Sequence, residues 1–409
     1  MGNSTSWKPT NSFFLLLCMV GLFAILSSTM SKNPVLSLFA KNLGTPDPWM
    51  GFVAAASTIP GILVSLPAGA LSDVIGRRKM VFFSGVVFAS APFLYLLITL
   101  PWQLILVRFY HGFATAIFVP VANAAIVERF PKKKGERISV FSSATMVGRS
   151  VAPFLGGYIL FVTGSNFHEL YVWVGVAGIT AFLLALTLRE EKPKPDEAPR
   201  LEKRSGIKWY SGFFGGWREI VRNRGVLVTS VVELVTYYSF GAFEYFLALY
   251  AKSVGLNDFL VGVVVGSQPV AIVVSKPFMG RLSDRFGRRT PILAGLLLAS
   301  VALIATSFAS QFIELIVISV TYGLGFSLVT SSTPALVSDL VGEEMSGTGM
   351  GFLGTMMDIG QTSGPIVTGL IFATAAGFSG SFISLGLILL VFGGFFFAST
   401  RTKTQIGQL

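Results

Sequence analysis

Long apolar stretches, separated by short polar segments, run along the whole chain. Each is about 20 residues or longer, the length that an α-helix needs to cross a ~30 Å hydrocarbon core. Helices are expected because backbone groups in hydrocarbon must be satisfied within the span, and the alternating pattern of barrel strands is absent from the sequence. The pattern predicts an all-α polytopic membrane protein with twelve transmembrane helices, near residues 11–31, 49–72, 79–99, 102–127, 138–163, 168–189, 225–250, 257–282, 290–309, 312–337, 346–374 and 377–399.

The composition agrees with a membrane protein and argues against several other classes. Hydrophobic residues make up 52% of the chain and charged residues only 12%, against roughly 25% charged residues in soluble domains. The single cysteine, Cys18, excludes an intramolecular disulfide, and one cysteine with two histidines leaves no credible zinc site. The sequence contains no Walker loop. We therefore expect a protein that is not an enzyme and that has no cofactor and no metal site.

The basic residues predict the orientation in the membrane. With the amino terminus placed inside, only three of the 31 Lys and Arg residues fall in outside segments, namely Lys32, Lys41 and Lys252. This asymmetry predicts a multi-pass protein of the cell membrane with both termini in the cytoplasm, in contact with anionic membrane lipids. It also accounts for the net charge of +11 without a nucleic-acid partner.

Two strings recur at nearly the same offset. "GALSDVIGRRKM" at 69–80 returns as "GRLSDRFGRRTP" at 280–291, 211 positions later, and "GRSVAPFLGG" from Gly148 returns as "GQTSGPIVTG" from Gly360, 212 positions later. The repeat predicts two homologous six-helix bundles, 1–189 and 225–409, around a central cavity that holds a small-molecule substrate. They are joined by a cytoplasmic linker, 190–224, with an interfacial helix from Trp209 to Ile220.

With these motifs the whole chain resembles a transporter of the major facilitator superfamily. The family's loop signature, Gly-x-x-x-Asp-x-x-Gly-Arg-Arg/Lys, is matched in both halves: at Gly69, Asp73, Gly76, Arg77 and Arg78, and again at Gly280, Asp284, Gly287, Arg288 and Arg289. The resemblance implies that these residues latch a cytoplasmic gate, in which Asp73 pairs with a neighbouring arginine or meets a helix amino end. The alternative is a static helix-end salt bridge with topogenic charge.

The second pair of strings resembles the signature of the drug:proton antiporter branch. Glycine and proline on one face permit close helix packing and a bend. The resemblance implies a helix hinge formed by Gly148, Pro153, Gly156, Gly157, Gly360, Gly364 and Pro365, and ordinary packing is the alternative. The sequence departs from the signature at Ala152, where the family has glycine, and at Arg149, a charge inside the span.

The fourth span carries "LVRFYHGFATA", in which Arg108 and Gly112 match the family's Arg-x-x-x-Gly pattern. A cation within a span is costly and is by default functional. We expect Arg108 to act in coupling or binding, with a structural ion pair as the alternative. We expect His111 to be a hydrogen-bonded packing residue, with a titrating histidine as the alternative.

Acidic residues within spans are the candidates for proton coupling. Glu233 and Glu244, eleven residues apart, share one helix face with Tyr237, and Asp358 precedes the second Gly-Pro string by about one turn. Each carboxylate could instead neutralise Arg108, Arg149 or Lys276 in a permanent ion pair.

The features together favour a proton-coupled antiporter, a monomer, that exports lipophilic or cationic compounds by alternating access. The acidic stripe and the aromatic-rich spans support this hypothesis. Two alternatives stay open. One is an uptake symporter or facilitator for a metabolite such as a sugar or an organic acid. The other is a lipid-handling or sensor protein on the same scaffold.

Overall fold

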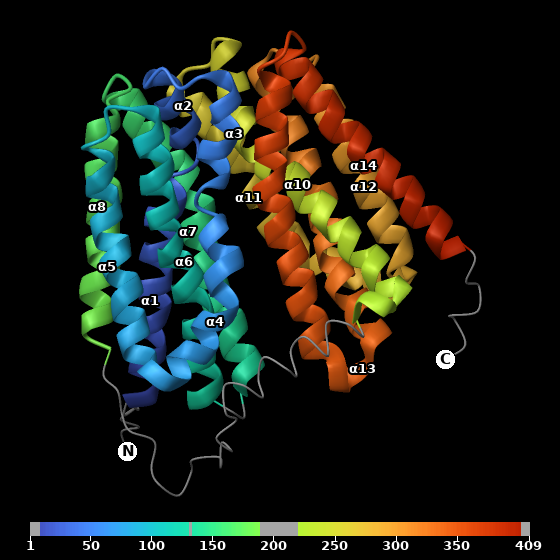
Figure 1. The fold of residues 1–409 in the computed structure, drawn as a ribbon, viewed down its shortest axis with the longest axis horizontal. Coiled ribbons are helices and arrows are strands. Elements are labelled where there is room, and N and C mark those ends of the chain that lie inside the picture. The colour runs from blue at the N-terminus through green and yellow to red at the C-terminus, as the bar shows by residue number, and fades with distance from the viewer. Residues whose placement is uncertain (1–8, 131–132, 189–219, 402–409) are drawn as a thin grey trace, which may run out of the picture. The chain divides into compact units, whose positions relative to one another are not determined.

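The computed structural model describes residues 9–130, 133–188 and 220–401, and the regular secondary structure of these residues is entirely α-helical (Figure 1). The first half contains α1 (Pro9–Met30), α2 (Val35–Asn42), α3 (Asp47–Ala55), α4 (Ile59–Ile75), α5 (Arg77–Tyr95), α6 (Pro101–Arg129), α7 (Lys134–Val162) and α8 (Phe167–Leu186). The second half contains α10 (Arg224–Ser253), α11 (Asp258–Phe286), α12 (Arg289–Thr306), α13 (Phe312–Phe372) and α14 (Gly377–Arg401).

These helices cover all twelve predicted spans. By length and apolar composition, nine helical segments of the described chain can cross a membrane. The long helix α13 contains two predicted spans. Gly342, which lies between them, has a non-helical backbone (φ 70°, ψ 177°) that divides α13 into two parts. The prediction of an all-α polytopic membrane protein is confirmed.

Two helix interruptions were not predicted. The first predicted span continues beyond a turn at 31–34 into α2, and the second is split at 56–58 into α3 and α4. A proline ring clashes with the carbonyl group four residues earlier and has no N–H to donate. Accordingly, Pro34 lies four residues after the end of α1 at Met30, and Pro60 lies four residues after Ala56, the C-cap of α3.

The described helices form two compact units. Unit 1 comprises Met1–Glu190 together with Glu244–Gly266, and unit 2 comprises Glu191–Phe243 together with Ser267–Leu409. The end of α10 and the start of α11 thus belong to unit 1, although the sequence repeat assigns them to the second half. The predicted linker and its interfacial helix lie outside the described residues up to position 219.

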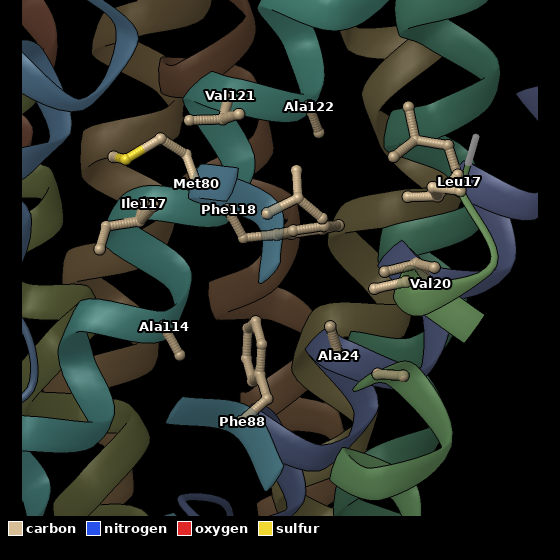
Figure 2. Close-up of a cluster of buried hydrophobic side chains, with 14 of the residues drawn as sticks. Leu17, Val20, Ala24, Met80, Phe88, Ala114, Ile117, Phe118, Val121 and Ala122 are labelled. Atoms are coloured by element: carbon tan, nitrogen blue, oxygen red, sulfur yellow. The ribbon is translucent and has the colours of Figure 1, made fainter. Parts of the chain in front are cut away.

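Unit 1 is built around an apolar core that fixes α1, α5 and α6 against one another (Figure 2). Phe88 of α5 and Phe118 of α6 meet edge to face with 6.0 Å between their ring centroids. Around them lie smaller buried side chains from the same three helices, including Leu17, Val20, Ala24, Met80, Ala114, Ile117, Val121 and Ala122.

The sequence repeat is also a repeat of contacts. A Cβ atom added at Gly148 would meet the carbonyl oxygen of Leu22 at 2.5 Å, and one added at Gly360 would collide with the carbonyl oxygen of Leu234. The two glycines are 212 positions apart, and so are the two leucines. In unit 1, α7 therefore packs on α1 at the position where, in unit 2, the second part of α13 packs on α10. The two homologous bundles share this helix packing.

Candidate functional site

A buried arginine lies next to two turns, the one that follows α1 and the one that separates α3 from α4. Arg108 of α6 is only 2% exposed. Its guanidinium donates to the Ser57 hydroxyl, in the turn between α3 and α4, at 2.6 Å. It also donates to Tyr95 at 3.3 Å and to Ser31, in the turn after α1, at 3.5 Å. The fold therefore brings the guanidinium of α6 to the turns at which α1 and α3 end.

Aromatic rings pack around Tyr95, one of the partners of this arginine. Tyr95 stacks on Tyr171 of α8 with 4.3 Å between ring centroids and 2° between ring planes. The Tyr95 hydroxyl lies 3.3 Å from Nδ1 of His111. We call Arg108, Ser31, Ser57, Tyr95, His111 and Tyr171 the Arg108 centre.

Three buried polar atoms of the Arg108 centre have no hydrogen-bond partner among the described residues: Arg108 Nε, His111 Nε2 and the Tyr171 hydroxyl. An unsatisfied buried polar atom costs free energy, roughly 1–3 kcal/mol for a neutral group. Of the two ring nitrogens of His111, Nδ1 has a hydrogen-bond partner, the Tyr95 hydroxyl, and Nε2 has none among the described residues.

Gly112 lets α6 approach the interrupted helix. A Cβ atom at this position would collide with the Ser57 carbonyl oxygen and would lie 3.0 Å from Cγ of Pro60. Arg108 and Gly112 are one helical turn apart, so both face the same turn between α3 and α4. This contact gives the Arg-x-x-x-Gly pattern a structural reason.

No carboxylate pairs with Arg108 in the described part of the chain. The acidic residues of unit 1 whose side chains are described have other partners: Asp47 with Lys41, Glu128 with Arg77, Glu136 with Lys133, Glu169 with Asn166, Glu244 with Lys32, and Asp258 with Lys252. The structural ion pair that was the alternative for Arg108 is not observed among these residues.

Glu233 lies in a different environment, in unit 2. Its carboxyl group is 4% exposed and lies 2.5 Å from the Thr333 hydroxyl of α13, while Lys276 is near enough for its charge to act on it. The same hydroxyl is 3.0 Å from the Val329 carbonyl oxygen. An ionised Glu233 accepts the hydroxyl proton, whereas a protonated Glu233 can donate to Thr333, which then donates to Val329. This geometry accommodates both protonation states.

Aromatic side chains lie on the same part of α10. Tyr237 contacts Phe326 edge to face at 5.1 Å between centroids, and Phe240 contacts Phe326 at 4.5 Å. Asp358, also in unit 2, is half-buried and forms no ion pair among the described residues. Tyr237 thus shares the Glu233 face, as expected from the helical spacing.

Glu244 is grouped with unit 1 and has partners of its own. Lys32 donates to one carboxylate oxygen at 2.7 Å and Asn33 donates to the other at 2.5 Å. A second buried carboxylate of the same hairpin, Asp258, accepts from Lys252 and Ser165, each at 2.5 Å. Glu233 and Glu244 therefore have separate sets of hydrogen-bond partners among the described residues.

The two copies of the loop signature form equivalent contacts. Arg77 bonds to Glu128 at 3.4 Å and to Ser72, and Arg288 bonds to Asp339 at 3.2 Å and to Ser283 at 3.4 Å. Each of these residue pairs repeats at an offset of 211.

Arg288 also pairs with Asp284, the partner that the signature implies, and this hydrogen bond is the main cause that raises the pKa of the Arg288 guanidinium. The side chain of the corresponding Asp73 and the surroundings of Gly69 lie outside the described part of the structure. Gly76 (φ 103°) and Gly287 (φ 76°) have backbones that favour glycine, which explains the turn at each motif.

Three further residues of the loop signature, Arg78, Gly280 and Arg289, have no ion pair or repeated contact of this kind among the described residues. Arg78 is exposed, Gly280 has open space beside it, and Arg289 donates to the Phe397 carbonyl oxygen at 3.0 Å.

The glycines of the expected hinge lie at close contacts between helices. Helix α7 continues through Pro153, and α13 continues through Pro365. A Cβ atom at Gly157 would lie 2.8 Å from Cα of Gly262 in α11, one at Gly156 would lie 3.3 Å from Val35, and one at Gly364 would collide with the Tyr238 carbonyl oxygen. Arg149 is exposed on α7 and forms no ion pair among the described residues.

Several residues of these sites were not predicted. Glu128 and Asp339 could have been found, because they are the acidic residues 51 positions after Arg77 and Arg288. Ser31, Ser57, Tyr95 and Thr333 carry no sequence signal of their own, since only the packing of distant helices brings them to Arg108 and Glu233.

Comparison with known proteins gives one family for the whole chain. The model of the Major Facilitator Superfamily matches residues 16–267 and 229–407. The chain is 24% identical to the multidrug resistance protein MdtG of Dickeya zeae, over 98% of this chain and 96% of that protein. It is 23% identical to the quinolone resistance protein NorA of Staphylococcus aureus, over 83% of this chain and 84% of that protein.

Solved structures share the fold at lower identity. A bacterial homolog of the human lysosomal transporter Spinster superposes with a TM-score of 0.81 at 17% identity, covering 97% of this chain and 98% of that chain. The nucleoside transporter NupG superposes with a TM-score of 0.77 at 13% identity, covering 95% of this chain and 99% of that chain.

Proposed function

This chain belongs to the major facilitator superfamily, and we propose that it is a proton-coupled exporter of lipophilic or cationic small molecules. It is a multi-pass membrane transporter rather than an enzyme. The multidrug and quinolone resistance proteins among its relatives support export of such compounds. The exporter acts by alternating access as a monomer in the cell membrane, with both termini in the cytoplasm.

The observation that carries the proposal is the environment of Glu233. A buried carboxyl group in a span is a candidate proton carrier, and its hydroxyl neighbour Thr333 can serve as donor or acceptor. Tyr237 and Phe240 of α10 contact Phe326 of α13, and these three rings form an apolar cluster that a lipophilic substrate can contact when the transporter opens. Glu233 therefore takes up a proton as the substrate leaves and releases it as the substrate binds.

The other candidate residues have secondary roles in this proposal. Asp358, half-buried and without an ion pair in the described residues, is a second proton carrier. The repeated loop signature around Arg77 and Arg288 latches the cytoplasmic gate, and the glycine-rich faces of α7 and α13 allow helices to shift against α1 and α10.

An uptake symporter or facilitator for a metabolite is the second candidate. The fold shared with a nucleoside transporter favours it. Transport by purified protein in proteoliposomes separates the two, because an antiporter moves protons against the substrate and a symporter moves them with it.

We expect that adding a lipophilic cation on one side drives protons toward that side, as reported by a pH dye inside the vesicles. Glu233→Gln should abolish the proton flux, whereas the exposed Arg222→Gln should leave it unchanged. Proton movement in the same direction as the substrate would favour the symporter.

A further inference from the structure

We propose that the Arg108 centre binds a carboxylate group, and that the transported molecules therefore include lipophilic acids. The inference rests on the proposed function, because it names a chemical class of substrate for the transporter. It assigns the anionic end of such a molecule to unit 1.

The first argument is charge. Arg108 is 2% exposed, and its hydrogen-bond partners in the described chain are three neutral hydroxyl groups. A buried cation without a counter-charge is unfavourable by several kcal/mol. The six acidic residues of unit 1 with described side chains are bound elsewhere. A carboxylate from outside the protein supplies the missing negative charge.

The second argument is the unused hydrogen-bonding capacity. Arg108 Nε has a donor without an acceptor, and the Tyr171 hydroxyl and His111 Nε2 are also unpaired in the described chain. A carboxylate has two oxygens with about four lone-pair sites and can accept several donors at once. An arginine binds such a planar group through two parallel N–H bonds, which a neutral ligand does not match in strength.

The third argument is the interrupted backbone. Ser31 and Ser57, two partners of Arg108, lie in the turns where α1 and α3 end. Transporters bind substrates where spanning helices are discontinuous, because the backbone there is free to contact a ligand. The centre is closed in this structure, so the ligand enters when these two turns rearrange.

The aromatic rings select the rest of the molecule. The stacked Tyr95 and Tyr171 lie beside the guanidinium, and Phe39 contacts Tyr171 at 5.3 Å. A flat apolar group attached to the carboxylate can pack against such rings. An amine is excluded from the Arg108 centre itself, since its charge has the same sign as that of Arg108.

The test compares three probes with the same ring system: 2-naphthoate, 2-naphthamide and 2-naphthylmethylamine. Binding to the full-length protein in lipid nanodiscs is measured by calorimetry, without any gradient or transport. We expect naphthoate to bind at least about tenfold more tightly than naphthamide, which corresponds to ~1.4 kcal/mol. Any binding of naphthylmethylamine should not depend on Arg108. Arg108→Gln should remove this preference, Arg108→Lys should keep part of it, and Arg222→Gln should not change it.

Equal affinities of wild type for naphthoate and naphthamide would overturn the proposal, and this comparison does not depend on any variant folding. An unchanged preference in folded Arg108→Gln would also overturn it. Displacement of naphthoate by millimolar chloride would make the centre an inorganic-anion site and would overturn its assignment to a substrate. Proton-coupled transport can fail in proteoliposomes while naphthoate still binds, so the two proposals fail separately.

Discussion

At the scale of single residues, the packing of α6 on the turn between α3 and α4 brings the Ser57 hydroxyl to within 2.6 Å of the Arg108 guanidinium. A charged residue inside an apolar span is visible in any sequence, so Arg108, Glu233, Glu244 and Asp358 could be selected without a structure. Their partners could not, because hydroxyl-bearing residues are common in helices. Ser57 became a partner of Arg108 only through the packing of α6 on the turn between α3 and α4.

Gly112 provides a direct test of that packing. A methyl group at this position would collide with the Ser57 carbonyl oxygen, so Gly112→Ala should destabilise the protein by about 1–3 kcal/mol. Thermal unfolding in detergent measures the effect. The matched control is Gly135→Ala on α7, where an added Cβ atom meets nothing within 4 Å. If both variants unfold at the same temperature, α6 does not depend on a close approach at Gly112.

Thr333 and Glu233 test the proton-carrying geometry. Glu233→Gln cannot ionise, so we expect proton-driven accumulation of substrate to fall at least about tenfold while exchange of substrate across the membrane continues. Thr333→Val keeps the shape but removes the hydroxyl that serves either protonation state, and it should weaken accumulation less. Accumulation that persists in Glu233→Gln would transfer the coupling role to Asp358.

At the scale of helices, the fold was predicted better than its irregularities. Apolar length located all twelve spans and the 211-residue offset located the repeat, since both depend on local composition. The interruptions before Pro34 and Pro60 were missed, because proline also occurs inside continuous helices of this chain, at Pro153 and Pro365. Tertiary packing decides which prolines end a helix, and a single sequence does not contain that information.

The repeated ion pairs make a prediction that belongs to this scale. Arg77–Glu128 and Arg288–Asp339 join equivalent helices, and each acidic side chain is more than half exposed. Exposed pairs contribute at most about 1 kcal/mol, so Glu128→Gln and Asp339→Asn should leave the unfolding temperature nearly unchanged. If the pairs belong to a gate, both variants should slow transport while substrate affinity is retained.

Proteoliposome uptake and equilibrium binding, measured on the same preparations, separate these outcomes. Asp284→Asn is the companion variant, because Asp284 also bonds to Arg288. A loss of binding as large as the loss of transport would show that these residues support the fold or the substrate site rather than a gate.

At the scale of the whole molecule, the chain does not divide where its sequence repeat does. The repeat places α10 and α11 entirely in the second half, yet Glu244–Gly266 is grouped with unit 1. Two buried carboxylates anchor this hairpin there: Glu244 through Lys32 and Asn33, and Asp258 through Ser165. The close approach of Gly157 to Gly262 adds a contact between backbones. No composition shift at 243 or 266 marks this division, so the sequence could not predict it.

If the two sequence halves move against each other during transport, these anchors must open in every cycle. The Lys32–Glu244 pair is then part of the conformational equilibrium, and a change in its strength shifts the populations of the two states. Lys32→Glu and Glu244→Lys each place two like charges together, and each should therefore slow transport strongly. The double variant Lys32→Glu with Glu244→Lys restores opposite charges and should recover much of the rate.

The measurement is a double-mutant cycle on initial transport rates, in which recovery gives a coupling energy between the two residues. Lys41→Glu with Asp47→Lys, an exposed pair elsewhere in unit 1, is the control and should show little coupling. Equal rates in wild type and both single variants would mean that the pair does not limit the cycle.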